Sequence, residues 1–498
     1  MSLFSRKKSL GLLLAQAGDS EKGLKRTLGA GNLVALGIGA IIGAGLFVRT
    51  AAAAGQAAGP AVTLSFIIAA IGCAFAGLCY AEFASMIPIA GSAYAYSYVT
   101  MGELVAWIIG WALIMEYALG AATVSIAWSE YLNKLLGGAV PYEWCHSPLE
   151  SYTDTSGVLH QGIMNAPALV ILLLLTLLLI KGTQESAMVN AIIVFIKVAI
   201  VVLFIAIGWQ FIRPENHTPY LIPEGTKPVL DAAGEELVNY DGFFKHGWGG
   251  VLGGAAIVFF AFIGFDAVST AAQEAKNPKR DMPIGILGSL VVCTILYILF
   301  GHVLTGVANW QEFVDPEKGR EASVAYAISN YMKGYEWLAT AVTVAILAGF
   351  SSVILVMLMG QSRIFYSMSN DGLIPKAFGE LHPKFQTPYK SNLILFVFVG
   401  AFAAFVPGHM AGDLTSFGTL FAFVLVSLGV WIMRRESPEM ERPFKTPLVP
   451  VVPILGAVIC LGMIVAIDLR TLKFALIWML IGLVVYFAYS KKRSKLNT

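Results

Sequence analysis

Of the 498 residues, 57% are hydrophobic and only 13% are charged, and the mean hydropathy is +0.73. Soluble globular chains carry about a quarter charged residues, so this composition excludes an ordinary soluble domain and indicates a polytopic helical membrane protein. The net charge of +2 indicates no particular partner class. The five cysteines show no paired or metal-ligand spacing, which argues against a disulfide framework.

Apolar runs of about 20 residues recur along the chain, and runs of this length predict transmembrane helices. Twelve such spans are expected, of which the fourth and the ninth are short. They lie near 31–54, 60–86, 101–132, 165–180, 188–212, 248–273, 283–306, 336–369, 391–406, 412–433, 448–467 and 472–490.

The spans divide into two halves of five helices and a final pair. In chain order we expect a cytoplasmic N-terminal tail at 1–30, a first five-helix repeat at 31–213, an extracellular loop at 214–247, a second five-helix repeat at 248–433, a cytoplasmic loop at 434–447, two further helices at 448–490 and a cytoplasmic C-terminal tail at 491–498.

Lysine and arginine are unevenly distributed between the loops. With the N-terminus inside, the cytoplasmic segments hold 21 of the 33 Lys and Arg residues, and the outer segments hold nine. Because cytoplasmic loops carry the excess of positive charge, both termini are predicted inside.

The first span contains the segment "GIGAIIGAGLFV" at 37–48, with Gly39, Gly43 and Gly45 near its centre. Glycine inside a helix costs roughly 1 kcal/mol relative to alanine. The sixth span has a similar weak point at "FFAFIGFD", where Gly264 follows an aromatic cluster. Breaks at corresponding positions of two halves point to a transporter's binding site near the middle of the membrane.

An unwound helix exposes N–H groups and carbonyls, which is tolerable in a membrane only where they face a cavity or a ligand. The N–H groups attract a carboxylate, and the carbonyls accept hydrogen bonds from an ammonium group. The breaks therefore predict a receptor for an amino-acid zwitterion. The alternative is close helix packing, since Gly39 and Gly43 fit the G-x-x-x-G spacing.

Ionisable residues at membrane depth are costly and usually functional. Lys197, in the fifth span, is interpreted as a proton carrier or as a fixed cation in place of a bound metal ion. The alternative is a structural lysine satisfied by backbone carbonyls. We expect its ammonium group to lie close to the carbonyls of the broken first helix.

Three acidic residues also lie within spans. Three roles for Glu116 stay open. Its carboxylate compensates the charge of Lys197, it attracts a substrate amine, or burial keeps the acid neutral. Asp266, just beyond the break in the sixth span, is interpreted as support for the unwound backbone. Glu82, near the inner end of the second span, is interpreted as part of a gate or of a charge pair.

The sequence contains no hydrolytic or nucleotide-binding motif, neither H-E-x-x-H nor G-x-x-x-x-G-K-[ST]. The sequence therefore argues against a membrane-embedded enzyme, and we expect no enzymatic activity.

At these residues the sequence resembles the amino acid–polyamine–organocation (APC) superfamily, and within it the bacterial type of the cationic amino acid transporter branch. The resemblance covers nearly the whole chain. It rests on "GIGAIIGAGLFV", "YAEFASMIPIAGSAYAYSYVTMGELVAWIIGW", "FFAFIGFDAVSTAAQEAKNPKRDMPIGI" and "GQSRIFYSMSNDGLIPKAFGELHPKFQTP". It implies an all-α fold of twelve helices, a five-plus-five inverted repeat of the LeuT-like or APC type with two extra helices, and secondary active transport by alternating access.

The resemblance also implies roles for individual residues. Gly43, Ala44 and Gly45 would bind the substrate carboxylate. The carbonyls of Ile41 and those around Phe260, Ala261 and Ile263 would bind the amine. Phe260 would close over the substrate, and Glu116 matches an acid near the amine.

Energy coupling and selectivity follow from the same resemblance. Lys197 matches the lysine that takes the sodium position of related carriers, and Ser351 and Ser352 stand where sodium carriers place ligands. The ammonium group of Lys197 and a sodium ion are unlikely to share this site, so coupling to protons is favoured over coupling to sodium. Phe350 is expected to shorten the side-chain pocket and to disfavour arginine.

The expected function is import of L-amino acids across the plasma membrane by proton symport. One alternative is a cationic amino acid carrier or exchanger for arginine and lysine, and a second is a transporter-like amino acid sensor. No metal, cofactor or nucleic-acid partner is expected, and the energy source is the proton gradient. Membrane lipid and a small accessory membrane helix remain open as partners.

Overall fold

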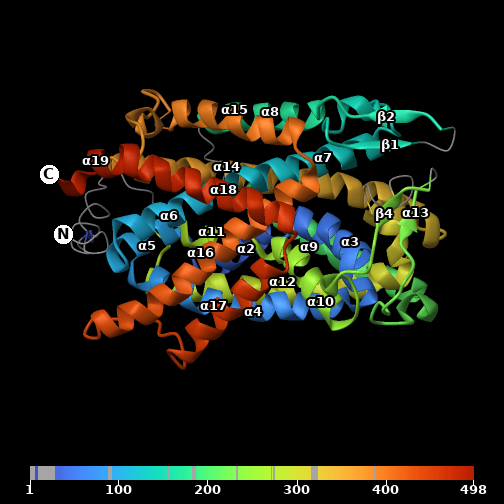
Figure 1. Ribbon diagram of the computed structural model, residues 1–498, viewed down its shortest axis with the longest axis horizontal. Helices are drawn as coiled ribbons and strands as arrows, with labels where there is room; N and C mark the ends of the chain where they lie inside the picture. The colour runs from blue at the N-terminus through green and yellow to red at the C-terminus, as the bar shows by residue number, and fades with distance from the viewer. Residues whose placement is uncertain are drawn as a thin grey trace.

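A computed structural model describes residues 6–8, 28–87, 92–153, 157–181, 187–231, 234–270, 272, 275–315, 323–385 and 387–497. Most of the expected N-terminal tail lies outside these residues. The long helices run roughly along one direction and form a bundle (Figure 1). The two ends of the chain meet at one end of the bundle, where Arg6 and Ser494 both contact Glu103.

The helices of the first half follow the apolar runs closely. The first run is divided among several short elements, because its centre is broken. The elements are α2 (Ala30–Ile41), a π-helical turn (Gly45–Arg49), α3 (Thr50–Ala53), a second π-helical turn (Ala54–Ala58), α4 (Val62–Met86), α5 (Ser92–Thr100), α6 (Glu103–Ile114), a π-helical turn (Met115–Leu119), α7 (Gly120–Leu135), α8 (Ala166–Lys181) and α9 (Ala187–Gly208).

The helices after residue 240 include the second broken element. They are α10 (Gly247–Val258), a 3-10 turn (Phe259–Phe262), α11 (Ala267–Thr270), α12 (Pro278–Val307), α13 (Ser323–Tyr331), α14 (Glu336–Asn370), α15 (Tyr389–Phe405), α16 (Gly408–Glu436), α17 (Val451–Val465), α18 (Leu469–Val485), a π-helical turn (Tyr486–Ser490) and α19 (Lys491–Arg493).

Eight helical stretches among the described residues are long and apolar enough to cross a membrane, and four shorter apolar helices accompany them. Each of the twelve expected ranges overlaps one or more of these helices. The fourth and ninth are short, as expected: α8 has 16 residues and α15 has 17. The chain is therefore a polytopic helical membrane protein.

The loops between α7 and α8 and between α9 and α10 contain two small antiparallel hairpins that the all-α expectation did not include. Strand β1 (Ser151–Thr153) pairs with β2 (Leu159–Gln161), and β3 (Val229–Leu230) pairs with β4 (Glu236–Val238). Strands of two or three residues are too short to give a recognisable alternating pattern.

The two broken helices lie inside the bundle. Helix α12 packs against α2 and α4, and α14 packs against α7 and α9. Many large apolar side chains on α8, α9, α17 and α18 are exposed, including Phe195 and Val484, as expected for surfaces that face lipid. The buried interior holds the helix breaks and the charged residues near them.

Candidate functional site

The first break follows α2. Ile42 has an extended backbone, with ψ at 103°. The N–H groups of Gly43, Ala44 and Gly45 donate to no backbone carbonyl in the described chain, whereas Leu46 donates to the Gly43 carbonyl at 3.1 Å. Three adjacent donors are thus left open at the start of the second half of this helix.

The second break follows α10. The 3-10 turn ends at Ile263, whose ψ is 135°. Gly264 has a φ of +114°, a conformation that side-chain-bearing residues rarely adopt. Helix α11 begins at Ala267. The interruptions predicted in both helices are confirmed.

The two breaks pack directly against each other. A Cβ added to Gly45 would lie 2.2 Å from the Ala261 Cα, and a Cβ added to Gly264 would lie 2.9 Å from the Ala40 carbonyl oxygen. Gly43 is less crowded, with the nearest Val353 methyl at 3.1 Å. The close approach of the backbones therefore requires glycine at 45 and 264, whereas the packing alternative named Gly39 and Gly43.

A tyrosine hydroxyl that the sequence did not single out joins the two breaks. The hydroxyl of Tyr297, on α12, lies 2.9 Å from the Ile41 carbonyl and 2.9 Å from the Ala261 carbonyl. Because a hydroxyl has one proton to donate, it hydrogen-bonds one carbonyl at a time. Tyr297 thus stands between the carbonyls that were expected to bind a substrate amine.

Lys197, on α9, satisfies the carbonyls at the end of α2. Its Nζ donates to the Gly39 carbonyl at 2.9 Å and to the Ile42 carbonyl at 3.1 Å. Its side chain is 2% exposed. The predicted position of Lys197 beside the broken first helix is confirmed, and no ion pair with Glu116 occurs among the described residues.

Glu116 and Asp266 occupy a separate buried polar cluster. They interact electrostatically with each other, and the Tyr117 hydroxyl donates to Asp266 Oδ2 at 2.8 Å. Within the described chain, neither oxygen of Glu116 nor Oδ1 of Asp266 has a hydrogen-bond partner. The carboxyl of Asp266 also faces the backbone N–H of Gly264. The cluster thus lies beside the second break.

Glu82 forms a buried charge pair, one of its two expected roles. Arg434 donates to both of its oxygens, at 2.9 and 2.8 Å, and the Thr446 N–H adds a bond at 2.8 Å. Arg442 lies 3.4 Å away. These contacts fasten the end of α16 and the segment after it to α4. The sequence did not identify the partners, because they are more than 350 residues away.

Phe260 belongs to the 3-10 turn at the second break, and Phe350 lies on α14. Phe350 packs against the rings of Phe47 and Tyr131, with centroid distances of 6.2 and 5.7 Å. The guanidinium carbon of Arg49 lies 5.9 Å from the Phe260 ring. Both rings are buried.

The two neighbouring serines on α14 differ in their hydrogen bonding. The Ser351 hydroxyl donates to the Leu347 carbonyl of its own helix at 2.9 Å. The Ser352 hydroxyl is buried and has no hydrogen-bond partner among the described residues. No group of three or more His, Cys, Asp or Glu side chains in the described part of the chain is placed to hold a metal ion.

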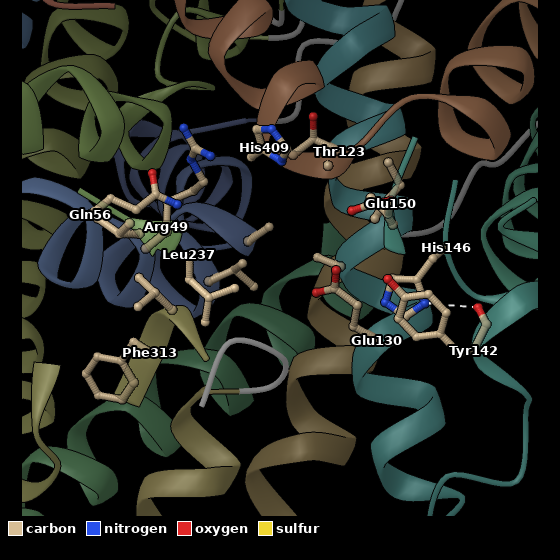
Figure 2. A pocket seen from close by; sticks show the side chains of 18 of the residues that line it. Arg49, Gln56, Thr123, Glu130, Tyr142, His146, Glu150, Leu237, Phe313 and His409 are labelled. Carbon is tan, nitrogen blue, oxygen red and sulfur yellow. Dashed lines mark hydrogen bonds between the residues drawn. The ribbon is translucent and has the colours of Figure 1, made fainter. Parts of the chain in front are cut away.

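A cavity of about 430 Å³ lies above the first break. Ala44 lines it, together with Arg49, Gln56, Thr123, Glu130 and Glu150. Figure 2 shows Arg49 and Gln56 on one side, and Glu130 and Tyr142 on the other. Arg49 forms an ion pair with Asp413. The cavity reaches from the two hairpins to the open backbone at residue 44.

Residues 28–487 match the family described as amino acid permease. The chain is 43% identical to the branched-chain amino acid permease BcaP of Bacillus subtilis, covering 99% of this chain and 98% of that one. It is 40% identical to the methylthioribose transporter of the same organism over the full length of both. It is 33% identical to the vacuolar cationic amino acid transporter 4 of Arabidopsis thaliana, covering 88% of this chain and 68% of that one.

Proposed function

This chain belongs to the amino acid permease family, within the APC superfamily, and from that premise we propose that it imports L-amino acids across the plasma membrane by proton-coupled symport. Members of the family are transporters, not enzymes. The observation that carries the proposal is the pair of packed helix breaks, with open N–H groups on one side and buried carbonyls on the other.

The proposed architecture has twelve transmembrane helices and both termini in the cytoplasm. Residues 31–213 and 248–433 form two inverted repeats, followed by a helix pair at 448–490. The overlap of the expected ranges with the observed helices supports this division. In this arrangement the two breaks lie in the first helix of each repeat. Alternating access moves these two helices relative to α14 and α16.

The substrate lies between the breaks. The N–H groups of Gly43, Ala44 and Gly45 bind its carboxylate, because open donors at a helix start favour an anion. The carbonyls of Ile41, Ala261 and their neighbours Phe260 and Ile263 bind its amine. The amine then competes with the Tyr297 hydroxyl for the Ile41 and Ala261 carbonyls. Glu116 contributes an acidic group near the amine, and Asp266 supports the unwound backbone.

Proton coupling is assigned to Lys197. Its ammonium group holds the Gly39 and Ile42 carbonyls, and loss of the proton removes the attraction between a cation and these dipoles. The end of α2 is then free to move, which links the proton gradient to substrate release. Because the ammonium group already occupies these carbonyls, Ser351 and Ser352 support the helix and do not hold sodium.

Selectivity is proposed to favour apolar side chains. Phe350 fills space between Phe47 and Tyr131, which shortens the pocket available to a substrate side chain. The name of the permease that is 43% identical over nearly the whole chain supports branched-chain substrates. The cationic transporters among the relatives make arginine and lysine the first competitors.

Uptake into proteoliposomes tests the proposal. The panel is labelled leucine, alanine, arginine and lysine, with methylthioribose included because a relative carries that name. We expect accumulation of leucine and alanine that increases with an inward proton gradient. Binding without accumulation of any substrate would contradict transport and favour a sensor. Arginine uptake that exceeds leucine uptake would contradict the proposed selectivity.

A further inference from the structure

Helix α18 exposes an apolar face that ends close to the C-terminus. It continues through the π-helical turn into α19, so that Leu469–Arg493 forms one helical stretch. Exposed apolar side chains recur every three or four residues, at Leu476, Leu480, Val484 and Phe487, and residues with this spacing share one side of a helix. Lipid acyl chains are the surroundings that such a face requires in a membrane. Phospholipids lined up along α18 therefore place their head groups beside α19.

Basic residues follow directly where the apolar face ends. Four cationic residues lie within five successive positions: Lys491, Lys492, Arg493 and Lys495. No acidic residue occurs between 469 and 498. The Lys491 Nζ lies 5.7 Å from the centroid of the Phe487 ring, and the guanidinium carbon of Arg493 lies 4.7 Å from that of the Tyr489 ring. The cations thus stand over the aromatic rings at the end of the lipid-facing stretch, as at a membrane interface.

The opposite side of this segment is fixed to the protein. The Ser490 hydroxyl donates to the Leu373 carbonyl, just after α14, at 2.6 Å. Ser494 is 2% exposed, and its hydroxyl donates to Glu103 at the start of α6. Figure 1 shows α19 at the end of the bundle where both ends of the chain lie. Because these contacts already hold the segment in place, little conformational freedom is lost when its basic face binds a ligand.

The carboxylates nearby have cationic partners of their own. Glu103 is fully buried, accepts a hydrogen bond from the Tyr486 hydroxyl at 3.0 Å and pairs with Arg6 at 3.4 Å. Asp371, at the end of α14, pairs with the Nζ of Lys8 at 2.7 Å. Both partners come from the N-terminal segment. The segment after α18 therefore keeps its excess of positive charge at the membrane surface.

We propose that the basic segment 491–495 binds the head groups of anionic phospholipids, whose acyl chains lie along the exposed face of α18. A cluster of about four Lys and Arg residues directly after a transmembrane helix attracts anionic lipid, and their N–H groups donate to phosphate oxygens. With the termini in the cytoplasm, the lipid belongs to the cytoplasmic leaflet. The bound lipid adds to the contacts of Ser490 and Ser494 and strengthens the attachment of the C-terminal segment to α6 and α14.

Thermal unfolding in nanodiscs of phosphatidylcholine, or of an equal mixture of phosphatidylcholine and phosphatidylglycerol, tests the site. A ligand that binds the folded state stabilises it, so phosphatidylglycerol should raise the unfolding temperature of the wild type by a few degrees. The shift should be mostly lost in the double variant Lys492→Gln/Arg493→Gln, whose two side chains are exposed. High salt should reduce the wild-type shift, because salt screens exposed charges.

The matched control is Lys384→Gln/Lys445→Gln, which removes the same charge from exposed positions in the loops after α14 and α16. It should keep the wild-type shift. No shift in the wild type, or the same shift in all three proteins, would overturn the lipid site. Equal loss in both double variants would overturn it too, since the effect would then follow the net charge of the protein.

Lipid retained through purification measures binding directly. Each protein is extracted with a mild detergent from liposomes of the same lipid mixture, and the phospholipids bound per protein are counted by mass spectrometry. The Lys492→Gln/Arg493→Gln protein should retain fewer phosphatidylglycerol molecules than the wild type and the control, whereas the retained phosphatidylcholine should be unchanged. Equal retention of phosphatidylglycerol would overturn the proposal. Neither measurement involves transport, so absence of amino-acid accumulation in proteoliposomes would contradict the proposed function alone.

Discussion

Lys197 and Gly349 face each other between α9 and α14, and the stem of the lysine fills the space where a side chain at 349 would stand. A Cβ added to Gly349 would lie 2.6 Å from Lys197 Cε and 3.3 Å from Cδ and Cγ. The Nζ beyond these atoms is held by two carbonyls of the first break. The missing side chain of Gly349 therefore gives Lys197 its path to α2.

Gly349→Ala should reduce proton-driven accumulation at least several-fold, because the added methyl group displaces the lysine stem and lengthens both hydrogen bonds. Substrate binding should persist, since the inner site is not touched. Uptake with an inward proton gradient, together with equilibrium binding of labelled leucine, checks this. Gly462→Ala is the control, because a Cβ at Gly462 meets nothing within 4 Å. Full accumulation in Gly349→Ala would show that coupling does not depend on the present position of the Lys197 side chain.

Gly45→Ala and Gly43→Ala should differ in their effect on the fold. The Cβ at 45 would collide with backbone atoms of Ala261, which cannot move without shifting the second break. The Cβ at 43 meets only a valine methyl at 3.1 Å. We expect Gly45→Ala to lower the thermal unfolding temperature in detergent clearly more than Gly43→Ala does. Equal unfolding temperatures would mean that the two breaks are not packed as described.

Tyr297→Phe removes the hydroxyl between the two breaks without changing the ring. A single hydrogen bond contributes about 0.5–1.5 kcal/mol, so a small loss of stability is expected. The larger expected change is a rise in substrate affinity, because the amine no longer competes with a hydroxyl for the Ile41 and Ala261 carbonyls. Leucine binding by isothermal titration measures this. A variant with wild-type affinity would show that the amine binds elsewhere.

Phe350→Ser should enlarge the side-chain pocket and leave a cavity beside Phe47 and Tyr131. Truncation of a buried phenylalanine to alanine costs roughly 3–5 kcal/mol, so reduced thermal stability is expected with serine. Among the amino acids tested, uptake of longer side chains, arginine included, should rise relative to that of alanine. An unchanged rank order in a folded variant would place Phe350 outside the pocket.

Much of the fold and part of the site follow from the sequence. The helix ranges were predictable because apolar length is a local property, and Lys197 was identified because a charge inside an apolar run is conspicuous. Both breaks were marked by glycines. The reason why glycine is needed there could not be predicted. It is the contact of Gly45 with Ala261 and of Gly264 with Ala40, which depends on which helices meet in space.

Other parts of the site depend on neighbours that are distant in the sequence. Tyr297 lies in an apolar run, where a tyrosine suggests an ordinary core residue. Its importance comes from two carbonyls on different helices. Arg434 and Thr446 could not be assigned to Glu82 from the chain alone, because nothing local indicates that α16 lies beside α4 at this depth.

Uptake of labelled L-leucine by proteoliposomes containing wild-type protein, Lys197→Ala or Lys197→Met tests whether Lys197 couples transport to the proton gradient. It is measured with and without an inward proton gradient, and with and without external sodium at constant pH and membrane potential. We expect wild type to accumulate leucine when the gradient is present and to be insensitive to sodium. Both variants should still bind leucine but lose the gradient-driven accumulation, because the ammonium group and not its stem holds the carbonyls of Gly39 and Ile42. Strong sodium dependence, together with full gradient-driven accumulation in Lys197→Ala, would rule out proton coupling through Lys197 and return Ser351 and Ser352 to the role of ion ligands.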